Sequence, residues 1–270
     1  PTPARWPRLE ALRVSRPNSA ALHALGAETW AGLRSLHLCN TERVVLAPPS
    51  ARALAAALRR VPALRALELR RVRLPDEAAQ ELFRASIADA APHLRTLTMS
   101  KWGARTSLTP AAARMLASAG WRLEALDLRG NLKLGAAGAA ALVAAPTFAL
   151  RRLNLQKCRL DAASLLNIAN APWPLEELDL SGNDFRSAAA ASALAALARH
   201  RGLRRLTIEY YLSAAGFKAL VEAHWPALTY LHTSSDSVAF DGPHALGAAA
   251  FAGFPALEEL GAYVALSEAG

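Results

Sequence analysis

The sequence predicts an α/β solenoid, a curved stack of about ten similar units with a parallel β-sheet along its concave face and helices along its convex face. Three observations predict it. A short pattern, L-x-x-L-x-L, recurs at intervals of 24 to 31 residues. Each copy is followed by a segment whose apolar residues recur at helical spacing. The chain is 53% hydrophobic, enough to bury a continuous core.

The first leucine of each copy marks where a unit begins. Units of this length are typical of solenoids, in which each unit contacts only its neighbours. We therefore expect residues 1–270 to form a single solenoid. The ten starts are Leu9, Leu33, Leu64, Leu94, Leu123, Leu150, Leu175, Leu203, Leu228 and Leu257.

The first half of each unit is predicted to be a strand with one buried face. Its fourth and sixth positions are leucine, as at Leu126 and Leu128 or at Leu178 and Leu180, and polar residues alternate with them. A single unit cannot fold alone. Three buried leucines contribute about 5 to 9 kcal/mol, whereas ordering the backbone costs about 1 to 2 kcal/mol per residue. Stacking of the strands has to supply the difference.

The second half of each unit is predicted to be a helix. Apolar residues follow helical spacing at Ala162, Leu165, Leu166 and Ala169. Helix starts are marked by capping residues, which are Thr109 before Pro110, Asp161 and Ser213. Prolines close the units one or two residues before the next first leucine, at Pro62, Pro92, Pro174, Pro226 and Pro255. Each helix must end there and the chain must return to the sheet.

Here the sequence resembles a known family. L-x-x-L-x-L-x-x-N/C-x-L is the leucine-rich-repeat pattern, and the helical half beginning LGAAGAAAL at Leu134 is similar to the ribonuclease-inhibitor-like class. The resemblance implies a horseshoe whose ninth-position residue hydrogen-bonds the turns of neighbouring units. Asn131, Cys158 and Asn183 match that position. Other units depart from the pattern at this position, and the departure puts the regularity of those units in doubt. The departing residues are Thr41, Val72, Trp102, Tyr211 and Asp236.

The uneven spacing and the exchange of Asn for Cys also resemble the repeats of F-box proteins. The array starts almost at residue 1 and stops within a repeat, without visible capping units. We therefore expect the chain to be part of a longer protein, because terminal caps normally keep such arrays soluble. The resemblance implies a substrate receptor of an F-box-type ubiquitin ligase. Bacterial effectors use similar repeats and are kept as an alternative.

Charge, cysteine content and hydropathy limit the partners and the cellular location that the protein can have. The net charge is +9, which suits an acidic protein, nucleic acid or an anionic surface. Cys39 and Cys158 are too far apart for a zinc or redox motif, which fits a reducing, cytoplasmic location. The apolar stretch Ala188–Ala198 is too short to span a bilayer. We expect no membrane segment.

No catalytic or cofactor motif accompanies the repeats. The seven histidines are dispersed, and Gly135 and Gly138 lack the G-K-S/T of a phosphate-binding loop. Asp127 and Asp179 occupy the same position two units apart, so they should lie near one another on the inner sheet, where paired acids could act in acid–base catalysis. Acids on a concave face more often contact a partner or a neighbouring unit. We therefore expect a non-enzyme without metal or cofactor.

Aromatic residues divide by position. Five tryptophans precede a first leucine and should fill the core, whereas the tyrosines fall on or just after the last strands, near His232. Exposed aromatics on a concave face are typical of binding hot spots. The alternative is that they pack over irregular units, as Tyr211 suggests. The tyrosines are Tyr210, Tyr211, Tyr230 and Tyr263, and the tryptophans are Trp6, Trp30, Trp121, Trp173 and Trp225.

Charge also divides along the positions expected to face inward. The first six units carry eight basic residues against Glu68 and Asp127. The last four carry Arg205 against four acids, which are Glu177, Asp179, Glu209 and Glu259. The strip should therefore be basic at one end and acidic and aromatic at the other. The basic residues are Arg13, Arg16, Arg70, Arg71, Lys101, Arg129, Arg152 and Lys157.

These patterns predict a module that binds a protein partner on its concave face. An RNA- or phosphate-binding surface is the alternative. It is less favoured because nucleic-acid readers interleave aromatics with basic residues, and here the tyrosines lie in the acidic half. The predicted contact residues are Tyr210, Tyr230, His232, Tyr263, Arg70, Arg71, Lys101, Arg129, Asp127 and Asp179.

Overall fold

Strand and helix alternate along most of the described chain, in the order that the repeats predict, except that the helix Ile87–Ala90 directly follows the helix Asp76–Leu82 and the strand Glu259–Val264 follows the strand Tyr230–Ser235 in the described residues. The structure is a computed structural model, and it describes residues 8–39, 45–83, 87–100, 108–235 and 252–264. The strands are β1 (Ala11–Ser15), β2 (Ser35–Cys39), β3 (Ala66–Arg70), β4 (Thr96–Thr98), β5 (Ala125–Asp127), β6 (Arg152–Asn154), β7 (Glu177–Asp179), β8 (Arg205–Glu209), β9 (Tyr230–Ser235) and β10 (Glu259–Val264).

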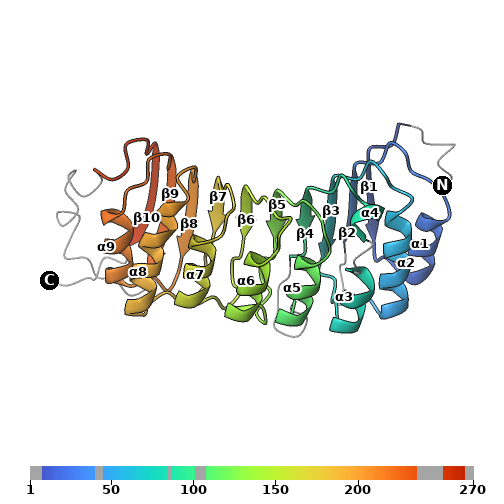
Figure 1. Cartoon of the computed structure of the whole chain (residues 1–270), viewed down its shortest axis with the longest axis horizontal. Helices are drawn as coiled ribbons and strands as arrows, with labels where there is room; N and C mark the ends of the chain where they lie inside the picture. The colour runs from blue at the N-terminus through green and yellow to red at the C-terminus, as the bar shows by residue number, and fades with distance from the viewer. Residues whose placement is uncertain (1–7, 40–44, 84–86, 101–107, 236–251, 265–270) are drawn as a thin grey trace.

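Helices follow the strands in turn. They lie on one side of the sheet, and β1 and β10 lie at opposite ends of the stack (Figure 1). They are α1 (Ser19–Gly26), α2 (Pro48–Leu58), α3 (Asp76–Leu82), α4 (Ile87–Ala90), α5 (Pro110–Ala117), α6 (Gly135–Val143), α7 (Ala162–Ala169), α8 (Ala188–Ala196) with the 3-10 turn η3 (Leu197–Arg199), and α9 (Ala214–Glu222).

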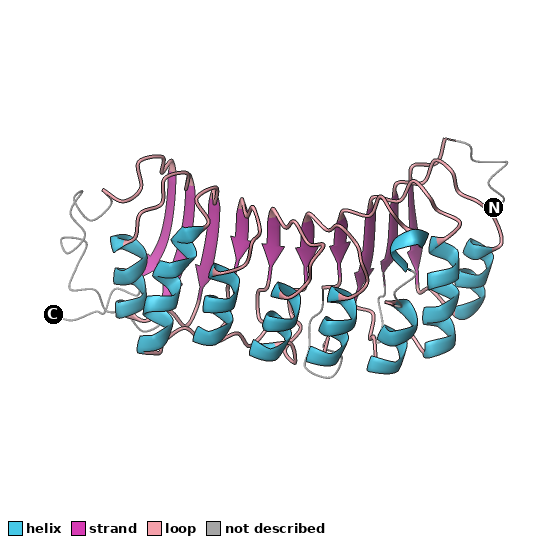
Figure 2. Cartoon of the chain, in the orientation of Figure 1, coloured by secondary structure: helices cyan, strands magenta, loops and turns pink. Residues whose placement is uncertain are grey.

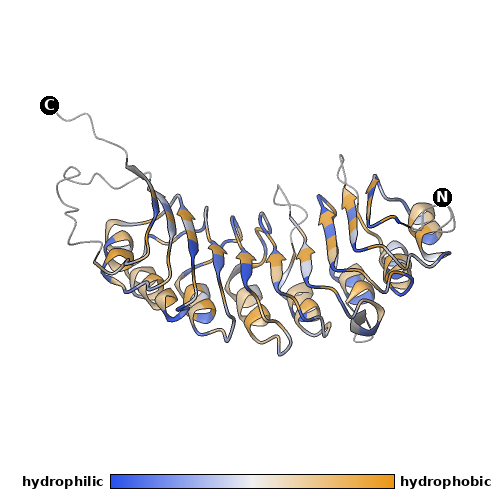
Figure 3. Ribbon diagram, turned by 90° about the horizontal axis from the view of Figure 1, so that it is seen from above, coloured by the Kyte–Doolittle hydropathy of each residue, from blue (hydrophilic) through white to orange (hydrophobic). Residues whose placement is uncertain are grey.

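The strands of the described residues form one parallel sheet in chain order, β1 to β10. Every pair is in the register set by the leucine pattern, so that Leu126, Leu153 and Leu178 lie side by side in the core. Strands occupy the inner side of a shallow arc and helices the outer side (Figures 2 and 3). The fold is therefore a leucine-rich-repeat solenoid, as predicted.

The core lies between sheet and helices and runs without a break from one end to the other. The four described tryptophans, Trp30, Trp121, Trp173 and Trp225, are buried at the junction of helix and strand, as predicted. Leu166 differs from the prediction. The helical spacing predicts it on the buried face of its helix, but it is 44% exposed because Leu165 and Ile168 already fill the core side of α7.

The predicted helix starts are confirmed by their hydrogen bonds. Thr109 caps α5 through the amide of Ala112, and Ser213 caps α9 through Gly216. Asp161 forms a capping box with Ser164 at the start of α7. These bonds satisfy amides that a helix start otherwise leaves without partners.

The ninth-position residues hold neighbouring coils together as the resemblance implies. Asn183 donates to the carbonyls of Leu155 and Leu180 and accepts from the amides of Cys158 and Leu160. Asn131 donates to Leu128 and to Met99 of the preceding coil and accepts from Leu108. The buried Cys158 thiol lies between them and donates to Leu128.

The ladder of ninth-position residues does not extend through every coil. Tyr211 is 44% exposed, and Val72 is an apolar core residue. Thr41, Trp102 and Asp236 lie outside the described residues. The departures that the sequence flagged are therefore real where they are described.

Candidate concave binding site

The strand register places alternate side chains in rows that run along the concave sheet. The third position of each repeat forms one row, and the fifth position forms a second row beside it. Core leucines lie between them on the opposite face. We call these the third-position row and the fifth-position row.

An aromatic and charged cluster lies on β8 and β9, and we call it the tyrosine cluster. The guanidinium carbon of Arg205 lies 3.9 Å from the centre of the Tyr230 ring. Tyr230 and His232 are stacked, with ring centres 6.3 Å apart and planes 15° apart. His232 Nε2 lies 3.1 Å from Glu209 Oε1. Four side chains from two strands thus support one another.

Gly261 on β10 makes room for this cluster. It pairs with His232 in the strand register, and a Cβ atom there would lie 2.2 Å from His232 Nδ1. The imidazole therefore lies against the backbone of the neighbouring strand. Any side chain at position 261 would displace it.

The cluster presents a fixed guanidinium to solvent. Arg205 is exposed, but its guanidinium lies over the Tyr230 ring. A guanidinium over an aromatic ring gains about 0.5 to 2 kcal/mol, and its N–H edges remain available for a carboxylate in paired geometry. The arrangement suits recognition of an anionic group beside an apolar one.

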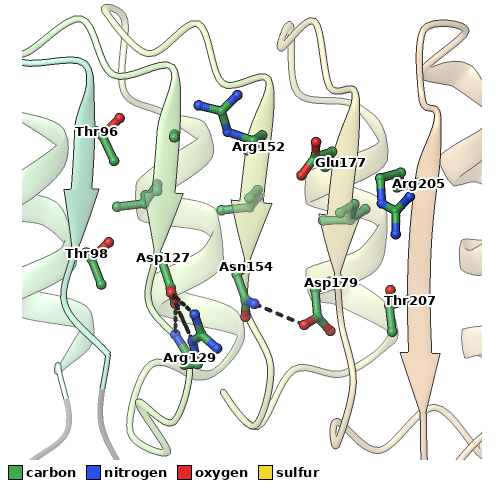
Figure 4. A pocket seen from close by; sticks show the side chains of 14 residues that line it. Thr96, Thr98, Asp127, Arg129, Arg152, Asn154, Glu177, Asp179, Arg205 and Thr207 are labelled. Atoms are coloured by element: carbon green, nitrogen blue, oxygen red, sulfur yellow. Dashed lines mark hydrogen bonds and ion pairs between the residues drawn. The ribbon is translucent and has the colours of Figure 1, made fainter. Parts of the chain in front are cut away.

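The middle of the concave face is a shallow hollow of about 390 Å³, lined by residues of β4 to β8 (Figure 4). Arg129 closes one side and binds Asp127 through Nε at 2.9 Å and Nη2 at 2.6 Å. These bonds raise the pKa of the Arg129 guanidinium. Arg129, a predicted steering residue, is therefore already engaged by an acid of its own coil.

Asp127 and Asp179 are brought to the same row, as predicted, with Asn154 between them. Asn154 donates to Asp179 at 3.0 Å (Figure 4). Two strand spacings amount to about 9.6 Å, and the Asp127 carboxylate also accepts the Arg129 amide. Each carboxylate is thus held by a neighbouring side chain. The two carboxylates could hold or orient a basic group.

The first coils carry a second cluster, in which Glu68 is buried between His37 and Arg70. His37 Nδ1 hydrogen-bonds Glu68, and Arg70 Nε forms an ion pair with it. Burial lowers the pKa of His37, and the positive charges of Arg13 and Arg70 lower it further. The predicted contact residue Arg70 is 58% exposed at its side chain, so it can still reach a partner.

The eighth position of the repeat forms a row at the carboxyl-terminal rim of the sheet, which we call the rim row. Six of its described members adopt left-handed backbone and donate an N–H to a carbonyl of the next coil, at 2.7 to 3.1 Å, whereas Ser235 and Val264 are the last residues of strands β9 and β10. The six are Arg16, Arg71, Gly130, Lys157, Gly182 and Tyr210. The left-handed region costs a residue with a side chain about 1 to 2 kcal/mol, so only the glycines suit it.

The rim row corrects the predicted charge strip. Arg16, Arg71 and Lys157 were assigned to the concave face, but the structure places them in the turn beyond the strands. On the sheet itself the basic excess of the first coils is correspondingly smaller. The basic character lies on the rim, and the concave face is mixed.

The other predicted contact residues are placed as follows. Tyr210 is 43% exposed on the rim row, not stacked with Tyr230. Tyr211 faces Arg186, whose guanidinium carbon lies 5.2 Å from its ring centre. Lys101 and the side chain of Tyr263 lie outside the described residues. Tyr230 and His232 are thus brought together, and Tyr210 lies apart from them.

Sequence reasoning missed Arg205, Glu209 and Gly261 as parts of the site. A signal was available, because Arg205 and Tyr230 share the third position of adjacent repeats and parallel register makes them neighbours. His232 and Gly261 likewise share the fifth position. Positional pairs across repeats therefore predict contacts that the count of charges does not.

Two further structural findings apply to the described residues. No helix among them is long and apolar enough to cross a bilayer. No three of their His, Cys, Asp and Glu side chains lie together in a way that could hold a metal ion.

Comparison with known proteins adds little to this description. No protein-family model and no curated protein sequence matches the chain. One similar solved structure is the Rad7 and Elc1 complex in yeast, with 17% identity and a TM-score of 0.41, covering 84% of this chain and 70% of that chain. The leucine-rich-repeat assignment rests on the register and the ninth-position ladder of this chain.

Proposed function

We propose that the chain is a protein-recognition module that binds a protein partner on its concave face and has no catalytic activity of its own. The observation that carries the proposal is the tyrosine cluster, where Arg205 lies on Tyr230 and Tyr230 on His232. Arginine and tyrosine are enriched at binding hot spots. Because their side chains are already ordered, binding loses less conformational entropy.

Affinity capture tests the proposal with a matched pair of variants. The chain holds a second Arg–Tyr contact, Arg186 over Tyr211, which lies outside the concave sheet. We expect the double variant Arg205→Ala, Tyr230→Ala to lose at least tenfold in affinity for the captured protein, and Arg186→Ala, Tyr211→Ala to retain it. Equal retention by both variants would refute concave binding.

A second candidate is an RNA- or phosphate-binding surface, which is favoured by the cations of the rim row. Phosphate contacts make affinity fall steeply with salt, by about 10³ to 10⁵ between 50 and 200 mM for six to ten contacts. Binding of a mixed-sequence RNA that falls in this way and is lost in Arg71→Ala would favour it. Capture of a protein that persists at 200 mM salt would count against it.

A narrower form of the first proposal is the substrate receptor of an F-box-type ubiquitin ligase. It is supported only by the resemblance of the irregular repeat spacing to F-box proteins. The coding sequence upstream of Pro1 tests it. An F-box or another partner-docking helix pair is expected there, and its absence would leave protein recognition standing without this role.

A further inference from the structure

The third-position row carries a regular series of side chains across six neighbouring strands. In register order it reads small, positive, negative, positive, aromatic and negative. The members are Ala125, Arg152, Glu177, Arg205, Tyr230 and Glu259. Opposite charges thus follow one another coil by coil from Arg152 to Arg205, and Tyr230 separates Arg205 from Glu259.

These charges are largely left for a partner. Arg152, Glu177 and Glu259 are exposed and form no ion pair within the described parts of the chain. Figure 4 shows the Arg152 guanidinium turned towards β5 and away from Glu177. The fifth-position row differs, since Asp127, Asp179 and His232 each have an internal partner.

The spacing of the row selects the kind of segment that can follow it. Neighbouring strands lie about 4.7 to 4.9 Å apart, and one turn of an α-helix advances about 5.4 Å. A helix along the solenoid axis therefore offers about one residue to each coil, with an error near 3 Å over five steps. Same-face residues of an extended strand are about 6.7 Å apart and leave register within two coils.

We infer that the partner docks through an α-helix that lies along the third-position row and turns a face of alternating charges towards it. This rests on the proposed function and names the partner's chemistry. The helix carries an acid opposite Arg152, a base opposite Glu177, an acid opposite Arg205, an apolar residue on Tyr230 and a base opposite Glu259. Positions i, i+4, i+7, i+11 and i+14 place such residues on one face.

The end of the hollow at β4 and β5 supplies an anchor point at the start of the row. Ala125 and Thr96 carry small side chains there, and Leu126 and Leu153 contribute to the lining. A bulky apolar residue one turn before the first acid of the docked helix fills this space. This end of the hollow and the Tyr230 ring are then the two apolar contacts, and the charged residues Arg152, Glu177 and Arg205, which also line the hollow, lie between them.

Synthetic peptides test the inference directly. The first is a stapled helix with the stated pattern, the second has every charge reversed at the same composition, and the third has proline at its centre. Fluorescence anisotropy with the full chain should show the matched helix binding at least tenfold tighter than either control. Equal binding of the matched and reversed helices, or no binding of the matched helix at millimolar concentration, would overturn the inference.

A charge exchange in the protein sharpens the test. Arg152→Glu with Glu177→Lys alters two exposed residues without internal ion pairs, and circular dichroism checks the fold. The variant should prefer a helix whose first two charges are exchanged, again by at least tenfold. The control exchange, Asp184→Lys with Arg186→Glu, alters an ion pair outside the sheet and should leave the preference unchanged.

Failure of the inference and failure of the proposed function give different results. If a captured protein depends on Arg205 and Tyr230 but the matched helix does not compete with it, protein recognition holds and the helix inference is wrong. If neither capture nor peptide binding depends on the concave residues, both are wrong. Displacement of the matched helix by RNA, observed only at low salt, would also overturn the helix inference.

Discussion

The coils that begin at Leu123 and Leu175 differ from the coil that begins at Leu203 in how they use the same two positions. The first two have glycine at the eighth position, Gly130 and Gly182, and asparagine at the ninth. The third has Tyr210 and Tyr211, both left-handed and both exposed. Where the pattern is kept, side chains satisfy buried backbone. Where it is lost, side chains are displayed to solvent at a cost in stability.

The largest expected effect comes from breaking the ladder of ninth-position residues. Asn183→Ala leaves two buried amides and two carbonyls without their partner. An unsatisfied buried group costs about 1 to 3 kcal/mol, so we expect a loss of about 3 kcal/mol in the free energy of unfolding. Urea denaturation measures it. Asn167→Ala on the surface of α7 is the control, and an equal loss there would contradict the role of the ladder.

The opposite experiment replaces a displayed side chain by the residue that suits its backbone. Tyr210→Gly removes a left-handed strain of about 1 to 2 kcal/mol and adds about 0.4 to 1 kcal/mol of chain entropy to the unfolded state. We expect the free energy of unfolding to rise by about 0.5 to 1 kcal/mol, as measured by thermal denaturation. A destabilised variant would show that the Tyr210 ring stabilises the fold rather than being available to a partner.

A smaller effect concerns His37 and pH. Its pKa is lowered in the folded state, first by burial. The unfolded chain therefore binds the proton more readily, and stability present above about pH 6.5 declines as the pH falls below that value. His37→Gln should flatten this part of the stability profile, measured by urea denaturation from pH 7.5 to 5.5. An unchanged slope would assign the dependence to other groups.

The smallest expected effect is the lack of reactivity of the Cys158 thiol towards an alkylating reagent. Burial raises the pKa of the Cys158 thiol to about 12, and only the thiolate reacts readily with alkylating reagents. At pH 9 we expect iodoacetamide to leave Cys158 unlabelled until the chain is unfolded, as followed by mass spectrometry. Labelling of native Cys158 at the rate of a free thiol would show that the coil opens.

Much of the fold could be predicted because repetition carries it. The starts at ten leucines predicted ten strands, and the residues before them predicted buried tryptophans. The site was harder to predict because it depends on pairs of side chains across coils. Arg129 with Asp127 and Arg70 with Glu68 are two residues apart in the sequence, so their pairing was accessible from sequence. The left-handed backbone at Arg71 was not, because the side chain there conflicts with it.

The composition of the helices on the convex side affects how open the concave face is to a partner. α6 and α8 consist mainly of alanine and glycine, and neither has a charged residue. Small side chains let helices approach to the lower end of the usual 8 to 10 Å, while strands stay about 4.8 Å apart. The curvature of a solenoid follows this difference in spacing. Closely packed helices on the convex side therefore reduce the curvature, and the concave face is more open as a result.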